Sequence, residues 1–70
     1  MQHSVALYET RKGEKFLGYL SDITSGTLRL HDRKTGNLVV FMVPCDSVKF
    51  IRYATVKEFN VLRGKVKIDL

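Results

Sequence analysis

The fold of this chain is decided by residues 13–51, GEKFLGYLSDITSGTLRLHDRKTGNLVVFMVPCDSVKFI. Short apolar and β-branched runs alternate there with turns that contain Gly, Pro, Asn or Asp, a pattern typical of an all-β domain. Gly18 stands inside the second run, where glycine weakens a strand unless the backbone bends sharply or another element approaches closely. The stretch therefore predicts a mainly β fold, a small and strongly bent five-stranded barrel.

The sequence around this stretch predicts one domain, residues 1–70, with its core in residues 4–53. Strands are expected at residues 4–10, 14–21, 27–31, 38–43 and 47–53. Thr55 and Glu58 have the spacing of a capping box, so a helix of about two turns is expected over residues 56–63. Charged and apolar residues alternate strictly over residues 65–70, which predicts an extra terminal strand.

The third and fourth strands differ in their patterns. Leu28 and Leu30 are expected to point into the barrel, while Arg29 and His31 face outward. Residues 38–43 are apolar on both faces, so both faces need cover. Burial between subunits is the favoured explanation, and a C-terminal helix lying over one face is the alternative.

Size and charge both favour a partner. A chain of 70 residues buries only about 60% of its unfolded surface, so a second subunit would help to stabilise it. Twelve Lys and Arg against seven Asp and Glu give a net charge of +5, which suits a polyanion such as nucleic acid. The alternative is that the lysines only solvate strand faces and edges.

No catalytic, metal or cofactor site is predicted. Cys45 has no neighbouring His, and His3 and His31 lack a third ligand, so the chain is not expected to be an enzyme. A single cysteine and the lack of a recognisable secretion signal favour the cytoplasm. The longest apolar run, residues 38–43, is far shorter than the roughly 20 residues of a membrane helix.

The order of these motifs resembles the Sm-like family, which comprises the Sm, LSm and Hfq proteins. Its first motif of turn glycine, strand glycine and alternating apolar residues corresponds here to Gly13, Phe16, Gly18, Leu20, Leu28 and Leu30. Its second motif corresponds to residues 41–51, and the match covers residues 5–53. The resemblance implies a divergent member of a family of bent barrels that close into rings and bind RNA.

The resemblance also implies that the fourth strand of one subunit pairs with the fifth strand of the next. The two apolar faces of residues 38–43 independently favour such an assembly, with about five to seven subunits. Lys49 and Arg52 are expected to form either ring salt bridges or contacts with solvent. The residues expected at the interface are Leu38, Val39, Val40, Phe41, Met42, Val48 and Phe50.

Nucleic-acid contacts are expected from two groups of residues. Basic residues of the two hairpin turns form a positive track if both turns reach one ring face; the alternative is exposed charge without a partner. They are Arg11, Lys12, Arg33 and Lys34. Polar residues in loops that line the family's pore are implied to contact unstacked bases. They are Thr24, Ser25, Thr27, Cys45 and Asp46.

Some of these residues have other expected roles. Asp46 alternatively caps its own turn, and Tyr8 and Tyr19 are expected to pack in the barrel rather than to stack on bases. Thr24, Thr27, Pro44 and Cys45 stand where the family has base-binding residues. Contact with RNA is therefore expected to depend on charge and ring geometry.

The leading hypothesis is a non-enzymatic Sm-like ring that binds RNA, or single-stranded DNA, in nucleic-acid processing or regulation. Two other classes of function are open. Residues 22–26 resemble the Asp-x-Ser turn of PilZ-like domains, which sense a cyclic dinucleotide. An SH3-like module that binds protein through its apolar fourth strand is the other alternative.

Overall fold

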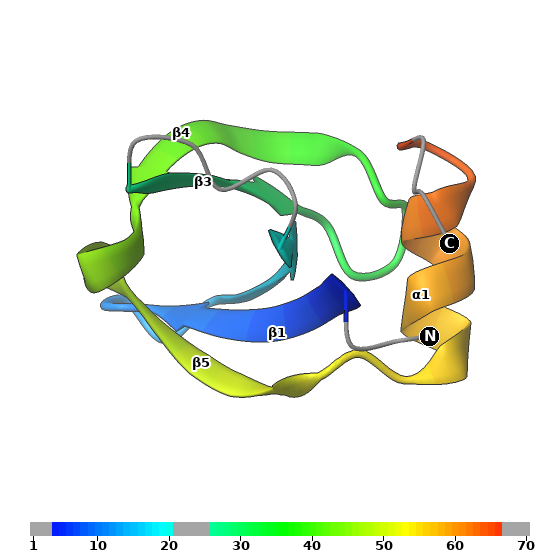
Figure 1. Cartoon of the computed structure of the whole chain (residues 1–70), viewed down its shortest axis with the longest axis horizontal. Coiled ribbons are helices and arrows are strands. Elements are labelled where there is room, and N and C mark those ends of the chain that lie inside the picture. Colours follow the sequence, from blue (N-terminus) through cyan, green and yellow to red (C-terminus); the bar gives the residue numbers. More distant parts are fainter. Residues whose placement is uncertain (1–3, 21–25, 67–70) are drawn as a thin grey trace.

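Five antiparallel strands form one sheet that is followed by a helix (Figure 1). The computed structural model describes residues 4–20 and 26–66. The elements are β1 (Val5–Thr10), β2 (Lys15–Tyr19), β3 (Thr27–His31), β4 (Leu38–Pro44), a 3-10 turn η3 (Cys45–Ser47), β5 (Val48–Tyr53) and α1 (Val56–Arg63). The predicted mainly β fold with a short C-terminal helix is confirmed. Most of the predicted terminal strand, residues 67–70, lies outside the described residues.

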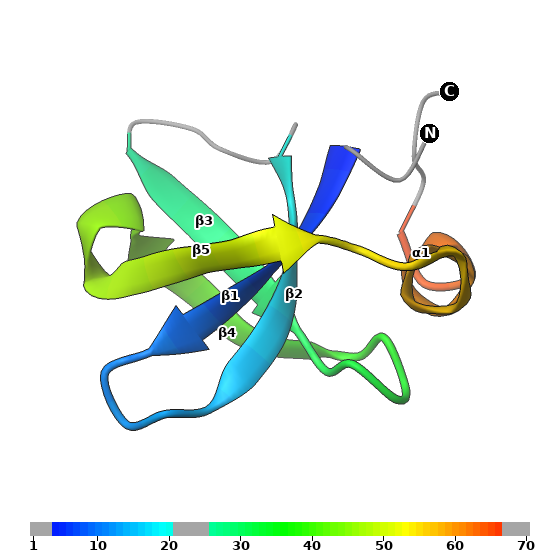
Figure 2. The ribbon, with the colours of Figure 1, turned by 90° about the horizontal axis from the view of Figure 1, so that it is seen from below.

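The strand order in the sheet is β4-β3-β2-β1-β5. The sheet curls so that β3 and β4 lie across the molecule from β1 and β5 (Figure 1). Although η3 joins β4 directly to β5, these two strands form the opposite edges of the sheet. Figure 2 shows how strongly the strands cross one another.

The strong bend has a structural cause in β-bulges. The register between β3 and β4 shifts on either side of Leu30, and the register between β1 and β5 shifts between Leu7 and Tyr8. An extra residue on one strand bends that strand and increases its local twist. The bulges therefore let five short strands curl around a small core.

Strand β1 is buried on both faces, because its successive residues point into two different clusters. The inner cluster, enclosed by the curled sheet, is built on Ala6, Tyr8, Leu28 and Leu30. The outer cluster lies between the sheet and α1 and contains Val5, Leu7, Leu17, Tyr19, Ala54, Phe59 and Leu62. Tyr8 and Tyr19 are both buried, which agrees with their expected packing roles.

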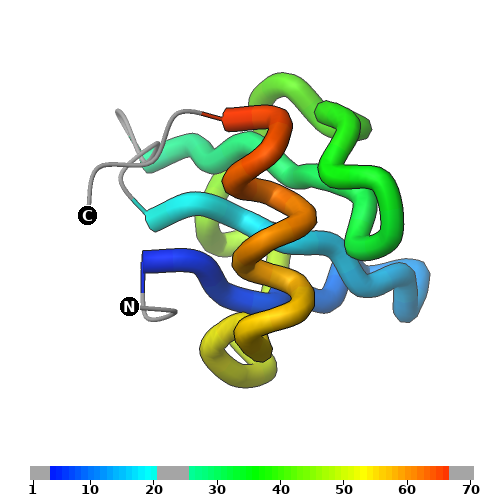
Figure 3. Tube along the Cα trace, turned by 90° about the vertical axis from the view of Figure 1, so that its right-hand side faces the viewer, coloured from blue at the N-terminus to red at the C-terminus, as the bar shows by residue number. Residues whose placement is uncertain are grey.

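Helix α1 closes the outer cluster by lying across β1 and β2 (Figure 3). The predicted capping box is present: Thr55 Oγ1 accepts from Glu58 N at 3.2 Å, and Glu58 Oε1 accepts from Thr55 N at 2.9 Å. Since α1 packs on the β1–β2 face, it does not provide the cover that was the alternative for β4. No helix among the described residues is long and apolar enough to cross a membrane.

His31 lies on the outer side of β3, as expected, since it pairs with Leu17 of the outer cluster, but it is buried there. It is 4% exposed, and its Nδ1 lies 3.1 Å from the carbonyl oxygen of Gly36. The hairpin that contains Gly36 packs so closely on α1 that a Cβ at this glycine would lie 2.9 Å from Val61 O. The alternation of side chains along β3 indicates on which side of the strand a residue lies. It does not indicate burial, which for His31 involves the contact with the hairpin at Gly36.

Candidate functional site

The turn between β3 and β4 is held rigidly by Asp32. Its Oδ2 accepts from Lys34 N at 2.9 Å, Thr35 N at 2.8 Å and Thr35 Oγ1 at 3.1 Å, and the two backbone N–H groups lower the pKa of this carboxyl. Gly36 has a φ of 77° and donates its N–H to Asp32 O at 2.9 Å. This turn therefore fixes the backbone that positions Arg33 and Lys34 beside α1.

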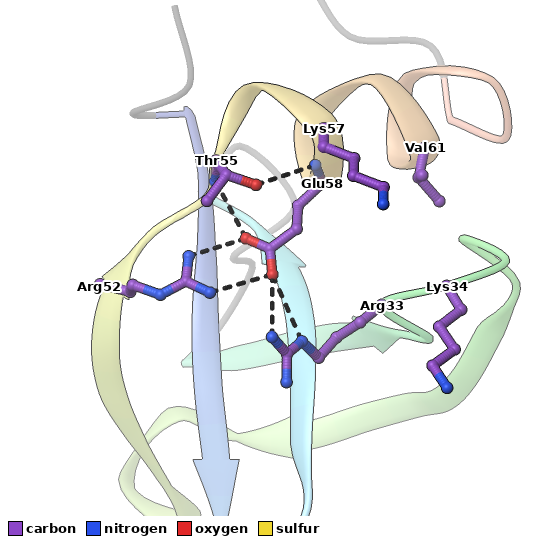
Figure 4. A pocket seen from close by; sticks show the side chains of 7 residues that line it. All are labelled: Arg33, Lys34, Arg52, Thr55, Lys57, Glu58 and Val61. Atoms are coloured by element: carbon purple, nitrogen blue, oxygen red, sulfur yellow. Dashed lines mark hydrogen bonds and ion pairs between the residues drawn. The ribbon is translucent and has the colours of Figure 1, made fainter.

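Glu58 of α1 joins three elements through one carboxylate (Figure 4). Arg52 of β5 donates from Nη1 to Oε1 at 2.8 Å and from Nη2 to Oε2 at 3.1 Å. Arg33 donates to Oε2 from Nη2 at 3.2 Å and from Nε at 3.4 Å. The Glu58 side chain is 11% exposed, whereas both arginine side chains are 40% exposed. The carboxylate is thus buried and each guanidinium keeps a face toward solvent.

These donors determine the charge of Glu58. Hydrogen bonds from Arg52, the Thr55 N–H and Arg33 lower the pKa of Glu58 from 4.5 to about 2, although burial acts in the opposite direction. The same interaction stabilises the charged form of Arg52, because its hydrogen bond to the carboxylate raises the pKa of the guanidinium. Glu58 is therefore ionised at neutral pH, and both arginines are held as cations.

A pocket of about 690 Å³ opens beside this bridge, and we call it the basic pocket. It is lined by Arg33, Lys34, Arg52, Thr55, Lys57, Glu58 and Val61. The ammonium end of Lys57 extends from α1 toward the hairpin that holds Arg33 and Lys34 (Figure 4). Neither lysine forms an ion pair with a carboxylate in the described ranges. Four cations and one carboxylate thus line the basic pocket.

The two basic turns predicted from the sequence lie near opposite ends of the long axis. Arg11 and Lys12 are exposed beside η3, where Arg11 and Asp46 line a shallow pocket of about 290 Å³. Arg33 and Lys34 lie beside α1 (Figure 1). The structure therefore brings Arg33 and Lys34 into the basic pocket and leaves Arg11 and Lys12 apart from them.

The two loops implied to line a pore do meet. Thr27 pairs with Pro44, and Cys45 N donates to Gly26 O at 2.9 Å. Cys45 is half-buried against the inner cluster, whereas Asp46 is exposed and η3 has no side-chain cap. Thr24 and Ser25 lie outside the described residues. Of the polar candidates within the described ranges, Asp46 is the most open to a ligand.

The expected interface residues divide into two groups. Phe41 and Met42 are neighbours on β4 and are 62% and 63% exposed. Both lie opposite Arg29 at the register shift between β3 and β4, whereas Val40 and Val43 on either side of them pack against the inner cluster. Leu38, Val39 and Phe50 are also exposed. Val40 and Val48 are half-buried against the inner cluster instead. An apolar surface is therefore present on both edge strands.

Sequence reasoning missed several members of these sites. Lys57 and Glu58 were not assigned to a binding site, although the Thr55–Glu58 spacing did predict the cap. Arg33 and Glu58 are 25 positions apart, and no local spacing predicts such a contact. The exposed apolar surface also includes Ile51, Tyr53 and Val56, which were not expected there.

Metal binding finds no support in the described part of the chain, since no three His, Cys, Asp or Glu side chains gather there. In comparisons with known proteins, no family model, no curated protein and no solved structure matched this chain.

Proposed function

We propose that this chain is a non-enzymatic Sm-like protein whose copies associate through β4 and β5 and bind single-stranded nucleic acid, with RNA as the preferred ligand. One observation supports it most. The sheet order makes β4 and β5 the two edges of a single bent sheet, and both expose large apolar side chains. These side chains are Leu38, Val39, Phe41 and Met42 on β4 and Phe50, Ile51 and Tyr53 on β5.

Association would cover the open backbone edges and the exposed apolar side chains of β4 and β5. An open strand edge offers unpaired backbone N–H and C=O groups, and exposed apolar side chains beside it favour pairing with another chain. Since β4 and β5 are different surfaces, a β4–β5 contact is heterologous and repeats until the assembly closes. A ring of about five to seven copies is the proposed outcome.

Charge favours a nucleic acid as the ligand of this assembly. The net charge of +5 is repeated in every copy, and phosphates are attracted to such an array with a strong dependence on salt. The loops that meet at Gly26 and Cys45 add polar groups near Asp46. We place this activity in the cytoplasm, in nucleic-acid processing or regulation.

Two measurements test the proposal. Light scattering should give a mass several times that of one chain. Fluorescence anisotropy with oligouridylate and oligoadenylate should show binding that weakens between a low and a high salt concentration. Absence of binding at low salt would reject the nucleic-acid part of the proposal.

A matched pair of variants tests the surface itself. Phe41→Glu places a charge on exposed β4 and should reduce the particle to single chains. Asn60→Glu places the same charge on an exposed position of α1 and should leave the mass unchanged. If Phe41→Glu keeps the mass of the parent, association does not use β4.

A second candidate is an SH3-like module that binds another protein. The exposed Phe41 and Met42 favour it, because a single chain with an open apolar strand has a surface suited to a protein partner. A monomeric mass together with no oligonucleotide binding would favour this function over the first.

A further inference from the structure

We infer that the basic pocket binds a phosphomonoester, the terminal phosphate of a nucleotide or of a nucleic-acid strand. The pocket is built by Arg33, Lys34, Arg52 and Lys57 of a single chain. It therefore goes beyond the proposed function, since it requires neither association through β4 and β5 nor a track of phosphates along a ring.

The charge distribution is the first argument. Four cations line the pocket with one ionised carboxylate, so three positive charges are in excess. The ion pairs of Glu58 with Arg52 and Arg33 hold α1 against the sheet. This structural role does not require Lys34 or Lys57. Gathering uncompensated like charges costs free energy, which a bound dianion would offset.

The orientation of the arginines is the second argument. Glu58 accepts from Nε and Nη2 of Arg33 and from Nη1 and Nη2 of Arg52. Arg33 Nη1 and Arg52 Nε have no acceptor within the described ranges, and both side chains are 40% exposed. Two planar guanidinium groups are thus fixed in advance with N–H donors remaining, an arrangement suited to phosphate oxygens.

The size of the pocket indicates what bears the phosphate. Its volume of about 690 Å³ greatly exceeds that of a phosphate ion and falls within the roughly 300–1,000 Å³ range of small-molecule sites. Val61 and Thr55 line it beside the charged groups, and the side chain of Val61 is apolar. A nucleoside-sized group attached to the phosphate therefore has both room and an apolar contact.

The direct test is a titration of the whole chain, followed by NMR of the arginine side-chain N–H groups, with adenosine 5′-monophosphate and with adenosine. The monophosphate should shift the Nε–H signals of Arg33 and Arg52 in a saturable way, and adenosine should not. Absence of a saturable shift with the monophosphate, or equal shifts with adenosine, overturns the inference.

A charge-matched pair of double variants locates the site. Lys34→Gln/Lys57→Gln removes the two ammonium groups that form no ion pair with a described carboxylate, and it should weaken monophosphate binding by about tenfold or more. Lys15→Gln/Arg63→Gln removes two exposed cations elsewhere and should change it by less than about twofold. Equal weakening in both doubles would mean unspecific attraction and would overturn the site.

Two oligouridylates, one with a 5′-phosphate and one with a 5′-hydroxyl, distinguish the sources of the phosphate. Tighter binding of the phosphorylated strand, lost in Lys34→Gln/Lys57→Gln, supports a strand end as the ligand. Saturable binding of the monophosphate without this difference supports a free nucleotide. Binding of the hydroxyl strand tests the proposed function separately, so the phosphate site and the proposed function can fail independently.

Discussion

Gly18 lies so close to the ring of Tyr8 that no side chain fits between them. A Cβ at this position would lie 2.8 Å from Tyr8 Cε2 and 3.1 Å from Leu28 Cδ2. Because Tyr8 is rigid and buried, we expect Gly18→Ala to lower the free energy of unfolding by about 1–3 kcal/mol. Urea denaturation followed by circular dichroism measures this change.

Gly64→Ala is the matched control for that substitution. Gly64 has a φ of −73°, and the nearest atom to an added Cβ, Val61 O, is at 3.6 Å. Alanine is tolerated in this conformation and restricts the unfolded chain, so stability should stay equal or rise by up to about 1 kcal/mol. If Gly18→Ala proves as stable as Gly64→Ala, the packing against Tyr8 does not constrain residue 18.

Glu58 should make stability depend on acid pH. Its pKa is lowered from 4.5 to about 2 on folding, so the folded state favours the ionised form. The resulting stabilisation is complete above pH 4.5 and is lost as the pH falls toward 2. Because the paired arginines are partly exposed, we expect Glu58→Gln to cost about 1–3 kcal/mol at pH 7.

The difference between Glu58→Gln and the parent chain should therefore shrink steadily between pH 5 and pH 2.5, about the range set by the two pKa values. Urea denaturation at several pH values measures it, with Glu14→Gln as a control at an exposed carboxylate. A difference that stays constant over this range would show that the ion pairs do not link folding to protonation.

At the scale of elements, α1 depends on its cap. Thr55 Oγ1 accepts the N–H of Glu58 at 3.2 Å, so Thr55→Ala leaves this donor without its partner. We expect a loss of about 1 kcal/mol, which lowers the melting temperature of a domain this small by roughly 4–8 °C. Thermal unfolding should show that Thr55→Ser restores most of the loss, because serine keeps the hydroxyl. Equal melting temperatures for all three chains would contradict a stabilising cap.

The elements themselves are the part of this molecule that sequence predicts well. Strand β3 and helix α1 occupy the predicted residues, because alternation and capping are local patterns. The basic pocket was not predicted, since it requires the β3–β4 turn, β5 and α1 to meet. The burial of His31 on the outer side was not predicted either, because its ring bonds to Gly36 O in a hairpin that follows β3.

At the scale of the whole molecule, the two edges allow a test of how copies pair. Phe41→Glu blocks β4 and Ile51→Glu blocks β5, and each variant alone should be monomeric if contacts run from β4 to β5. An equimolar mixture should then form a dimer, because each variant supplies the edge that the other lacks. Native mass spectrometry measures the species present. A dimer formed by Ile51→Glu alone would indicate β4–β4 pairing instead.

The outer cluster joins β1 to α1, the first and last elements of the described chain, and this affects how the protein is made. All five strands leave the ribosome before residues 56–63 do. Until α1 emerges, Val5, Leu7, Leu17 and Tyr19 have no cover on the outer face. The nascent sheet is then prone to aggregation, and stable folding must wait until almost the entire described chain has been synthesised.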